Sequence, residues 1–322
     1  MITPASTMKW LIKRELWEHK GGFFWAPIVV GAILTLFVIL SLAAVVLGTS
    51  GAAQINGVPV EAFAAGMTDT DKLVFISTIT RWYMGASTPL FLLLGFVVFF
   101  FCLNALFDER KDRSILFWKS LPVTDGATVI SKALLAIVIA PAITLVIAIV
   151  TSMLVLLLIC AAMTIKGVSL SGYILTTPAT YLAPLQWVAL LPIYALWALP
   201  TAGWLLMVGA WARTKPFLWA VGVPLLAGGL VSWLSKLFQF GWDLSWFWKN
   251  IVGRGLLSIV PGSWFNAGTM AINNRDFSNH NEAEILSQSW QLLGTANLWL
   301  GVIAGAAMIY AAIRIRRWKD DG

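Results

Sequence analysis

The sequence predicts an all-α polytopic membrane protein with six transmembrane helices, and three observations lead to this prediction. Apolar residues make up 59% of the 322 residues, charged residues only 11%, and the mean hydropathy is +0.82. Six apolar runs are long enough for a helix to cross a bilayer, which takes about 20 residues. Basic residues gather at alternate ends of these runs. This composition excludes a soluble globular domain.

The first predicted element is a helix at residues 6–20, which is too charged to cross a membrane and is expected to lie amphipathically in its interface. Its apolar face consists of Met8, Leu11, Ile12 and Leu16. Glu15 falls on this apolar face, whereas Trp17 lies nearly opposite it. Glu15 therefore needs a buried or interfacial partner, for which we expect Arg110 or Arg113.

The six spans follow from the apolar runs, and the predicted ranges are 24–48, 88–107, 129–161, 187–210, 217–238 and 297–313. The third run exceeds the length that a bilayer needs, so tilt, an extension into water or a kink at Pro141 must absorb the excess. Loops are expected at 49–87, with room for a surface helix, and at 162–186. A tight turn at 212–216 should join spans four and five.

The segment 239–296 is expected on the outer side, with part of it re-entrant. Residues 251–272 are apolar, but they contain Arg254 and a break at Pro261-Gly262. Two half-helices dipping into the outer leaflet fit this pattern better than a full span, although a pair of surface helices stays open. For Arg254 we expect snorkelling to the interface, with an ion pair or a cavity as the alternatives.

The distribution of charge predicts the orientation. The side with both termini, the segment after span two and the 212–216 turn has fifteen of the 22 basic residues and eight of the 15 acidic ones, a net charge of +7. The other side has seven of each sign. By the positive-inside rule, the side with the termini is cytoplasmic. The basic character of the chain thus reports orientation, and no nucleic-acid partner is expected.

The stretch 108–124 interrupts the apolar sequence with a run of charged residues followed by a short apolar segment. Six consecutive ionisable residues, 108–113, cannot lie in lipid. A short helix candidate with apolar residues at Phe117, Trp118 and Leu121 follows, and Pro122 stops it. An apolar knob on a charged loop is unfavourable in water, so we expect it to insert into the groove of a partner protein.

Several motifs are absent or have an ordinary explanation. No G-x-x-x-x-G-K-[ST], H-E-x-x-H or G-x-S-x-G sequence occurs, so the chain is not expected to hydrolyse ATP, hold a metal or act as an enzyme alone. Cys102 and Cys160 lie within apolar runs, where a thiol behaves as a small hydrophobe. Gly301-x-x-x-Gly305 matches a small-residue packing motif, for which packing within the subunit is favoured over dimerisation.

The stretch ALFDERKDRSILFWKSLPVTDG, with residues 105–125 as its most specific part, resembles the segment between spans two and three of ABC-2 type transporter permeases. The helix containing Lys13-Arg14-Glu15, the six spans and the broken segment before span six resemble the same family over most of the chain. The long third span and the roughly 25-residue loop after it depart from the family pattern.

The resemblance implies roles for individual residues. The helix 6–20 would be a connecting helix, and its candidate functional residues are Arg14, Glu15 and Trp17. The coupling residues that would dock on a separate ATPase are Asp108, Glu109, Arg110, Arg113, Phe117, Trp118, Leu121 and Pro122. The candidate residues of the translocation path or exit gate are Asn104, Arg254 and Pro261, although the bland interpretation of Asn104 is an interface residue.

The resemblance also implies a function. The chain would be the permease subunit of an ATP-driven ABC transporter in the inner or plasma membrane, dimerising with a second copy, and export is the favoured direction. This chain would bind no cofactor itself, because ATP and Mg would be bound by the partner ATPase subunit. Two alternatives stay open. An ion-coupled secondary transporter is disfavoured because no span interior holds a paired carboxylate or histidine. A membrane-embedded enzyme is disfavoured by the missing motifs.

Overall fold

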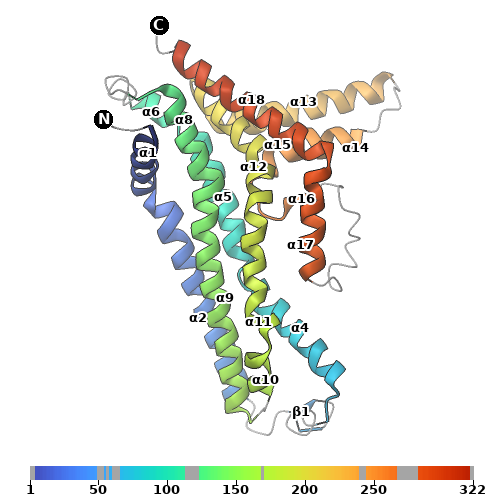
Figure 1. Cartoon of the computed structure of the whole chain (residues 1–322). Helices are drawn as coiled ribbons and strands as arrows, with labels where there is room; N and C mark the ends of the chain where they lie inside the picture. Colours follow the sequence, from blue (N-terminus) through green and yellow to red (C-terminus); the bar gives the residue numbers. More distant parts are fainter. Residues whose placement is uncertain are drawn as a thin grey trace. The chain divides into compact units, whose positions relative to one another are not determined.

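The computed structural model describes residues 4–48, 54–55, 58–59, 66–112, 123–167, 170–238, 244–266 and 282–319 (Figure 1). These residues form an all-α protein, as predicted, and their only strands are the two-residue pair β1 (Gln54–Ile55) and β2 (Val58–Pro59). Six helices are long and apolar enough to cross a membrane. The predicted all-α architecture with six candidate membrane spans, which indicate a multi-pass membrane protein, is therefore confirmed.

Three groups of helices follow one another in the first half of the chain. They are α1 (Pro4–Glu18), the π-helix η1 (Gly21–Trp25) and α2 (Ala26–Gly48); α4 (Asp69–Gly85), α5 (Thr88–Asn104) and α6 (Phe107–Lys111); and α8 (Asp125–Leu134), the π-helix η2 (Leu135–Ile139) and α9 (Ala140–Ile165). The predicted spans 24–48, 88–107 and 129–161 each lie within one of the long helical stretches Gly21–Gly48, Thr70–Lys111 and Asp125–Ile165.

The second half of the chain begins with three short helices. The elements are α10 (Leu170–Thr176), α11 (Pro178–Leu182), η3 (Ala183–Leu185), α12 (Gln186–Trp211), α13 (Pro216–Phe238), α14 (Leu244–Phe247), the π-helix η4 (Trp248–Gly253), α15 (Arg254–Leu257), α16 (Ser263–Asn266), α17 (Glu282–Gln291), η5 (Leu292–Gly294) and α18 (Ala296–Lys319). The predicted spans 187–210, 217–238 and 297–313 lie within α12, α13 and α18.

One predicted loop contains a helix for which the sequence left room, and the other is more helical than expected. The 49–87 segment contains the 17-residue helix α4, which begins with a capping box between Thr68 and Asp71. The 162–186 segment contains α10, α11 and η3. In the third span, the π-helix η2 comes directly before Ala140-Pro141, and such π turns let a helix adjust around a residue without a backbone N–H.

The turn between spans four and five is confirmed, because α12 ends at Trp211 and α13 begins at Pro216. Lys215 has a φ of 48°, a left-handed conformation that is uncommon for a residue with a side chain. The break at Pro261-Gly262 is also present, because Gly262 has a φ of +83° between α15 and α16. Glycine reaches this conformation without steric cost.

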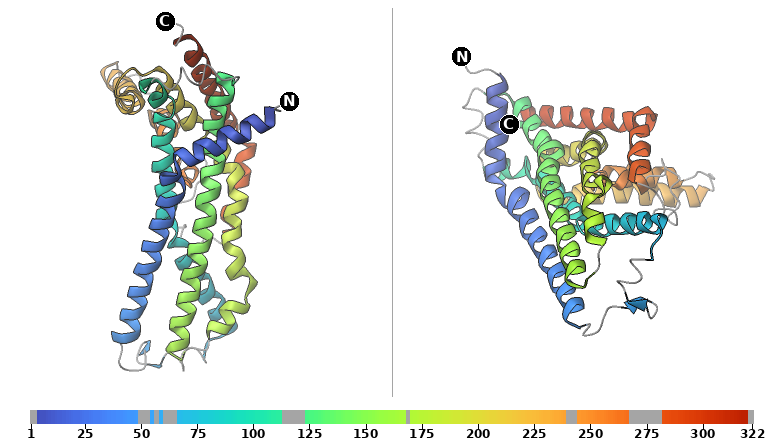
Figure 2. Two further views of the ribbon diagram at one scale, coloured as in Figure 1. Left: turned by 90° about the vertical axis from the view of Figure 1, so that its left-hand side faces the viewer. Right: turned by 60° about the horizontal axis from the view of Figure 1, so that its bottom comes forward.

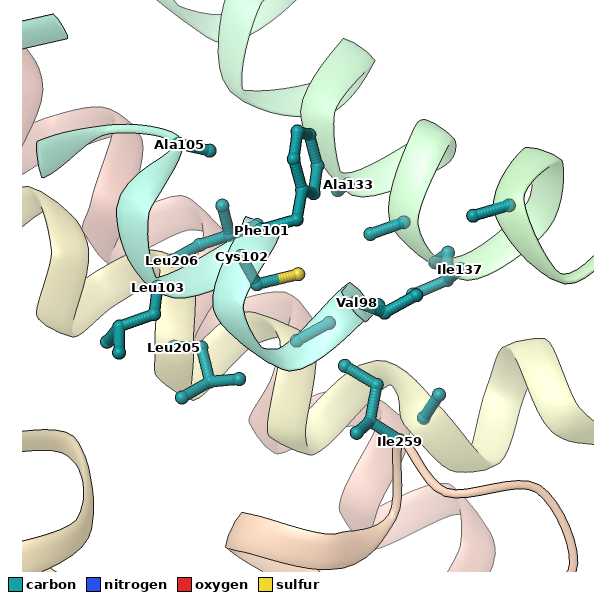
Figure 3. Packing of buried hydrophobic residues seen from close by; sticks show 14 of the residues in the cluster. Val98, Phe101, Cys102, Leu103, Ala105, Ala133, Ile137, Leu205, Leu206 and Ile259 are labelled. Carbon is teal, nitrogen blue, oxygen red and sulfur yellow. The ribbon is translucent and has the colours of Figure 1, made fainter. Parts of the chain in front are cut away.

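The chain forms two compact units, and the first comprises Met1–Phe23, Leu92–Ala142 and Leu190–Gly322. Its core contains buried side chains from α5, α8, η2, α12 and the turn after α15. Figure 3 shows several of them, namely Val98, Phe101, Cys102, Leu103, Ala133, Ile137, Leu205, Leu206 and Ile259. Both views in Figure 2 show α1, in blue, lying beside α8, in green. This unit contains every residue of the candidate sites described below.

Glycines allow α12 and α18 to approach closely within the first unit. A Cβ atom at Gly203 would lie 2.5 Å from the carbonyl oxygen of Gly305, and one at Gly305 would lie 2.6 Å from the carbonyl carbon of Leu199. The Gly301-x-x-x-Gly305 motif therefore packs inside the subunit, as predicted. In α13, Gly228 makes room for Trp248, whose ring would lie 2.9 Å from a Cβ there.

The second unit comprises Phe24–Phe91 and Ile143–Ala189. Its core includes Ile76 and Tyr83 from α4, Val155 from α9 and Ile174 from α10. The Tyr83 hydroxyl donates a hydrogen bond to the carbonyl oxygen of Thr180. Tyr83 thus ties α4, in the predicted loop 49–87, to α11, in the predicted loop 162–186.

Candidate functional site

The first candidate site lies at the two ends of residues 113–122, which are outside the described residues together with the predicted coupling residues Arg113, Phe117, Trp118, Leu121 and Pro122. Before this segment, Asp108 and its neighbours form α6, one short helical turn where a charged loop was expected, and Asp112 is its C-cap. After it, Thr124 caps α8 by accepting a hydrogen bond from the Ala127 N–H at 3.2 Å. Both stems of the segment are therefore helical.

Lys132 on α8 is the centre of a group of buried charges. Its Nζ lies 2.8 Å from Oε2 of Glu15 on α1 and 3.0 Å from Oε1 of Glu109 on α6. The side chains of Lys132 and Glu15 are only 3% and 2% exposed. A single ammonium group therefore holds α1 against both stems of the segment.

Arg316 on α18 binds the same group from another direction. Its Nη1 lies 2.5 Å from Oε2 of Glu109, and its Nε lies 3.1 Å from Oδ1 of Asp125. The Arg316 side chain is 3% exposed. We call Glu15, Glu109, Asp125, Lys132 and Arg316 the ionic cluster. It joins four helices, α1, α6, α8 and α18.

The ionic cluster contains three carboxylates and two cations. Arg14 supplies a third positive charge, 3.5 Å from Glu15 and 3.1 Å from Glu18, but its side chain is 38% exposed. Removing charges from water costs several kcal/mol per ion, and only close pairing offsets this cost. Each member is therefore strongly dependent on the others, and the four helices are fixed relative to one another by charge as well as by packing.

Arg110 has a different partner. Its Nη2 donates to the carbonyl oxygens of Gly209 and Ala212, each at 2.7 Å. These carbonyls lie at the C-terminal end of α12, where backbone acceptors have no partner within the helix and a positive charge is favoured. Arg110 thus connects α6 to the turn between spans four and five.

The predicted partner of Glu15 was wrong in part. Glu15 is buried, as its place on the apolar face indicated, but it pairs with Lys132 and Arg14, whereas Arg110 caps α12. Arg113 is outside the described residues. The physical reason is that Lys132 follows one helical turn after Thr128 on the buried face of α8, which brings its ammonium group to α1.

The remaining predicted residues of the connecting helix and the charged stretch lie near the surface. Trp17 is 64% exposed, and Asp108 is exposed. Asp108 and Asn104 line a cavity of about 550 Å³ beside His19, Phe96 and Phe101. The cavity lies between η1 and α5, so Asn104 faces open space and the pathway interpretation of this residue stays a prediction.

Arg254 forms a second site, where the expectation of snorkelling was wrong. The residue is 5% exposed. Its Nη1 donates to the carbonyl oxygen of Asn297 at 2.5 Å and to Asn297 Oδ1 at 2.6 Å, and its Nη2 donates to the carbonyl oxygen of Leu298 at 3.2 Å. Its guanidinium carbon lies 4.3 Å from the centre of the Trp197 ring. The guanidinium is therefore hydrogen-bonded by backbone and amide oxygens of the protein, and it does not reach the membrane–water interface as a snorkelling arginine would.

Lys132 and Arg316 are the functional candidates that sequence reasoning missed. Lys132 offered a signal, because it is a lysine three residues inside the predicted span 129–161. Arg316 offered none, because it lies among other basic residues that the positive-inside rule already explains.

Within the described ranges, no group of three or more histidine, cysteine, aspartate or glutamate residues could hold a metal ion. Pro261, the third gate candidate, lies half-buried in the turn between α15 and α16.

No protein-family model, curated protein or solved structure matches this chain.

Proposed function

We propose that this chain is the permease subunit of an ATP-driven ABC transporter of the ABC-2 type, which couples ATP hydrolysis by a separate subunit to movement of a substrate across the membrane. The observation that supports this most is the ionic cluster. It ties both stems of residues 113–122 to α1 through Glu15 and to α18 through Arg316. A partner that displaces the segment would therefore displace helices that cross the membrane.

In this proposal the energy comes from the partner. The ATPase subunit binds ATP and Mg, and residues 108–124 form the coupling segment that docks on it through Phe117, Trp118 and Leu121. When two ATPase subunits close on ATP, the segment shifts. Because Glu109 and Lys132 are buried and paired, they move as a body with α1 and α18 and not past them.

The same proposal assigns the orientation and the assembly. Both termini and residues 108–124 lie in the cytoplasm, the protein resides in the inner or plasma membrane, and two copies form a homodimer. The apolar range 251–272, which the structure describes only as far as Asn266, would be re-entrant near the exit, with Arg254 and Pro261 in its described part. The net charge of +7 on one side supports the orientation. Export is the direction that the resemblance favours.

One observation favours a second candidate, an ion-coupled secondary transporter. Lys132 lies between Glu15 and Glu109, and all three are buried. Buried ionisable residues that pair with one another in a membrane protein mark ion pathways and proton relays. The two candidates differ in their energy source, so transport in sealed vesicles that stops on ATP removal but survives a protonophore supports the ABC transporter, and the reverse result supports the ion-coupled one.

The proposed function is tested by truncating the docking side chains. Phe117→Ala combined with Trp118→Ala removes two apolar anchors, and anchors at the centre of an interface are worth about 2 kcal/mol or more each. We expect the variant to insert normally but to lose its ATPase subunit when the tagged permease is purified in detergent. Lys111→Ala, which removes an exposed charge on α6, is the matched control and should retain the ATPase.

Retention of the ATPase together with full transport in the double variant would refute the coupling role of residues 108–124. Loss of the ATPase in the Lys111→Ala control as well would show a general effect of charge, which also contradicts docking through the two aromatic side chains.

A further inference from the structure

A cavity of about 380 Å³ lies between α12, α13, α15 and α18, within the first unit. We call it the Arg254 cavity. One charged side chain and two amides, Arg254, Asn250 and Asn297, contribute its polar wall. Trp204, Trp246 and Leu300 are among the apolar side chains that form the rest. The cavity thus combines a small polar end with an apolar body, which is the usual composition of a ligand site.

The polar end has a positive charge without a counter-charge. The hydrogen-bond acceptors of Arg254 are backbone carbonyls and the side-chain oxygen of Asn297. In the described part of the chain, no carboxylate forms an ion pair with Arg254. The guanidinium also lies against the first turn of α18, whose helix dipole is positive at that end. Two positive fields therefore coincide in a buried place, which an anion would stabilise.

Unused hydrogen-bond donors surround the same end. Arg254 Nε is buried and has no acceptor among the described residues. Arg254 Nη2, Asn297 Nδ2 and Asn250 Nδ2 each carry two hydrogens, and the described chain accepts one from each, at Leu298, Asn250 and Trp246. The polar groups left without a partner are therefore donors, the type that an anion needs.

The fold makes room for this arrangement. A Cβ atom at Gly301 would collide with Nη2 of Arg254, so the absence of a side chain there lets the guanidinium approach the backbone of α18 this closely. The guanidinium carbon also lies over the Trp197 ring, 4.3 Å from its centre. Thr201 Oγ1 donates to the carbonyl oxygen of Arg254 at 2.8 Å and fixes the backbone. The arginine is held in place from three sides.

The apolar walls indicate that the ligand is an amphiphile. Trp246 and Leu300 line the cavity and are 60% and 65% exposed, so its rim opens where α18 and the segment before α15 are uncovered. An apolar chain can lie along these side chains while its head reaches Arg254. We propose that the Arg254 cavity binds a membrane amphiphile with a net negative head group, the anion at Arg254, Asn250 and Asn297 and the chain along Trp246 and Leu300.

This inference does not rest on the proposed function, so it is tested on the purified protein alone. The probes are phosphatidylglycerol, zwitterionic phosphatidylcholine and inorganic phosphate, added to the protein in nonionic detergent, with bound molecules counted by native mass spectrometry. We expect saturable binding of phosphatidylglycerol, at least tenfold weaker binding of phosphatidylcholine, and no displacement by inorganic phosphate.

Two variants locate the site. Arg254→Gln should weaken phosphatidylglycerol binding about 10- to 100-fold, as expected for hydrogen bonds to a charged group. Asn250→Leu removes an amide donor, keeps a side chain of similar size and should weaken binding several-fold. If Arg254→Gln does not fold, this variant tests the site in its place. Lys249→Gln removes an exposed cation from the same helical segment and should leave binding unchanged.

Three results would overturn the proposal. The first is a folded Arg254→Gln variant, or in its place the Asn250→Leu variant, with unchanged affinity for phosphatidylglycerol. The second is equal binding of the zwitterionic lipid. The third is displacement of the lipid by inorganic phosphate alone, which would indicate a site for free anions.

Discussion

Replacement of Lys132 by methionine tests the ionic cluster most directly, because the side chain keeps its length and loses its charge. Lys132 lies 2.8 Å from Glu15 and 3.0 Å from Glu109, so the variant leaves two buried carboxylates without their common cation. Breaking a buried pair costs about 3–5 kcal/mol. Glu109 keeps Arg316 at 2.5 Å and Glu15 keeps Arg14 at 3.5 Å, so we expect a loss of about 3 kcal/mol.

The assay is the free energy of unfolding in mixed micelles, measured for a set of variants. Arg14→Met is the control, because Arg14 is 38% exposed and exposed pairs contribute about 0–1 kcal/mol. Glu15→Leu combined with Lys132→Met replaces one buried pair by apolar side chains, which is often close to neutral. The double variant should therefore be more stable than the two single effects predict, by at least about 1 kcal/mol.

If Lys132→Met destabilises the protein no more than Arg14→Met, the ionic cluster is solvated and not buried, which would refute the expected loss. Strict additivity of Glu15→Leu and Lys132→Met would also contradict a direct interaction between the two side chains.

The other predictions concern packing, capping and topology. Gly305→Ala should destabilise the protein, because its Cβ would lie 2.6 Å from the backbone of α12, whereas Gly222→Ala, with open space around it, should stabilise it by up to about 1 kcal/mol; thermal unfolding compares the two. Arg110→Ala should cost about 1–3 kcal/mol in the free energy of unfolding, because two carbonyls at the end of α12 lose their donor. Single cysteines at Ser114 and Asn279, in a background without the two native cysteines, should label from opposite sides of the membrane. Labelling of both by an impermeant reagent in intact cells would refute the six-span topology.

Hydropathy was sufficient to find the spans, because a bilayer imposes a length and a composition on each helix independently of its neighbours. It was a weaker guide for the segments 49–87 and 162–186, where α4, α10 and α11 form. These segments are mixed in composition, and their helices are stabilised by contacts such as the one from Tyr83 to Thr180. Periodicity alone does not contain such contacts.

For the two sites with buried charges, too, the sequence indicated one part of the arrangement and left another part open. That Glu15 is buried followed from its place on one face of a helix, since the positions on a face are fixed by 3.6 residues per turn. That Arg254 needs partners followed from an arginine in an apolar segment. The identity of their partners did not follow from the sequence, because Lys132 is 117 residues from Glu15 and Asn297 is 43 residues from Arg254 along the chain.

The sequence by itself determined that this is an all-α membrane protein with six spans, a charged interruption after the second and an amphipathic helix before the first. These properties depend on local composition, because the bilayer accepts or rejects each segment according to the residues of that segment. Only the tertiary structure decided that Lys132 and Arg316 join both stems of that interruption to α1 and α18, and that Gly301 leaves room for Arg254 beside a cavity. A buried charge is stabilised by whichever groups the packed helices bring within about 3–4 Å, and that is a property of the whole fold.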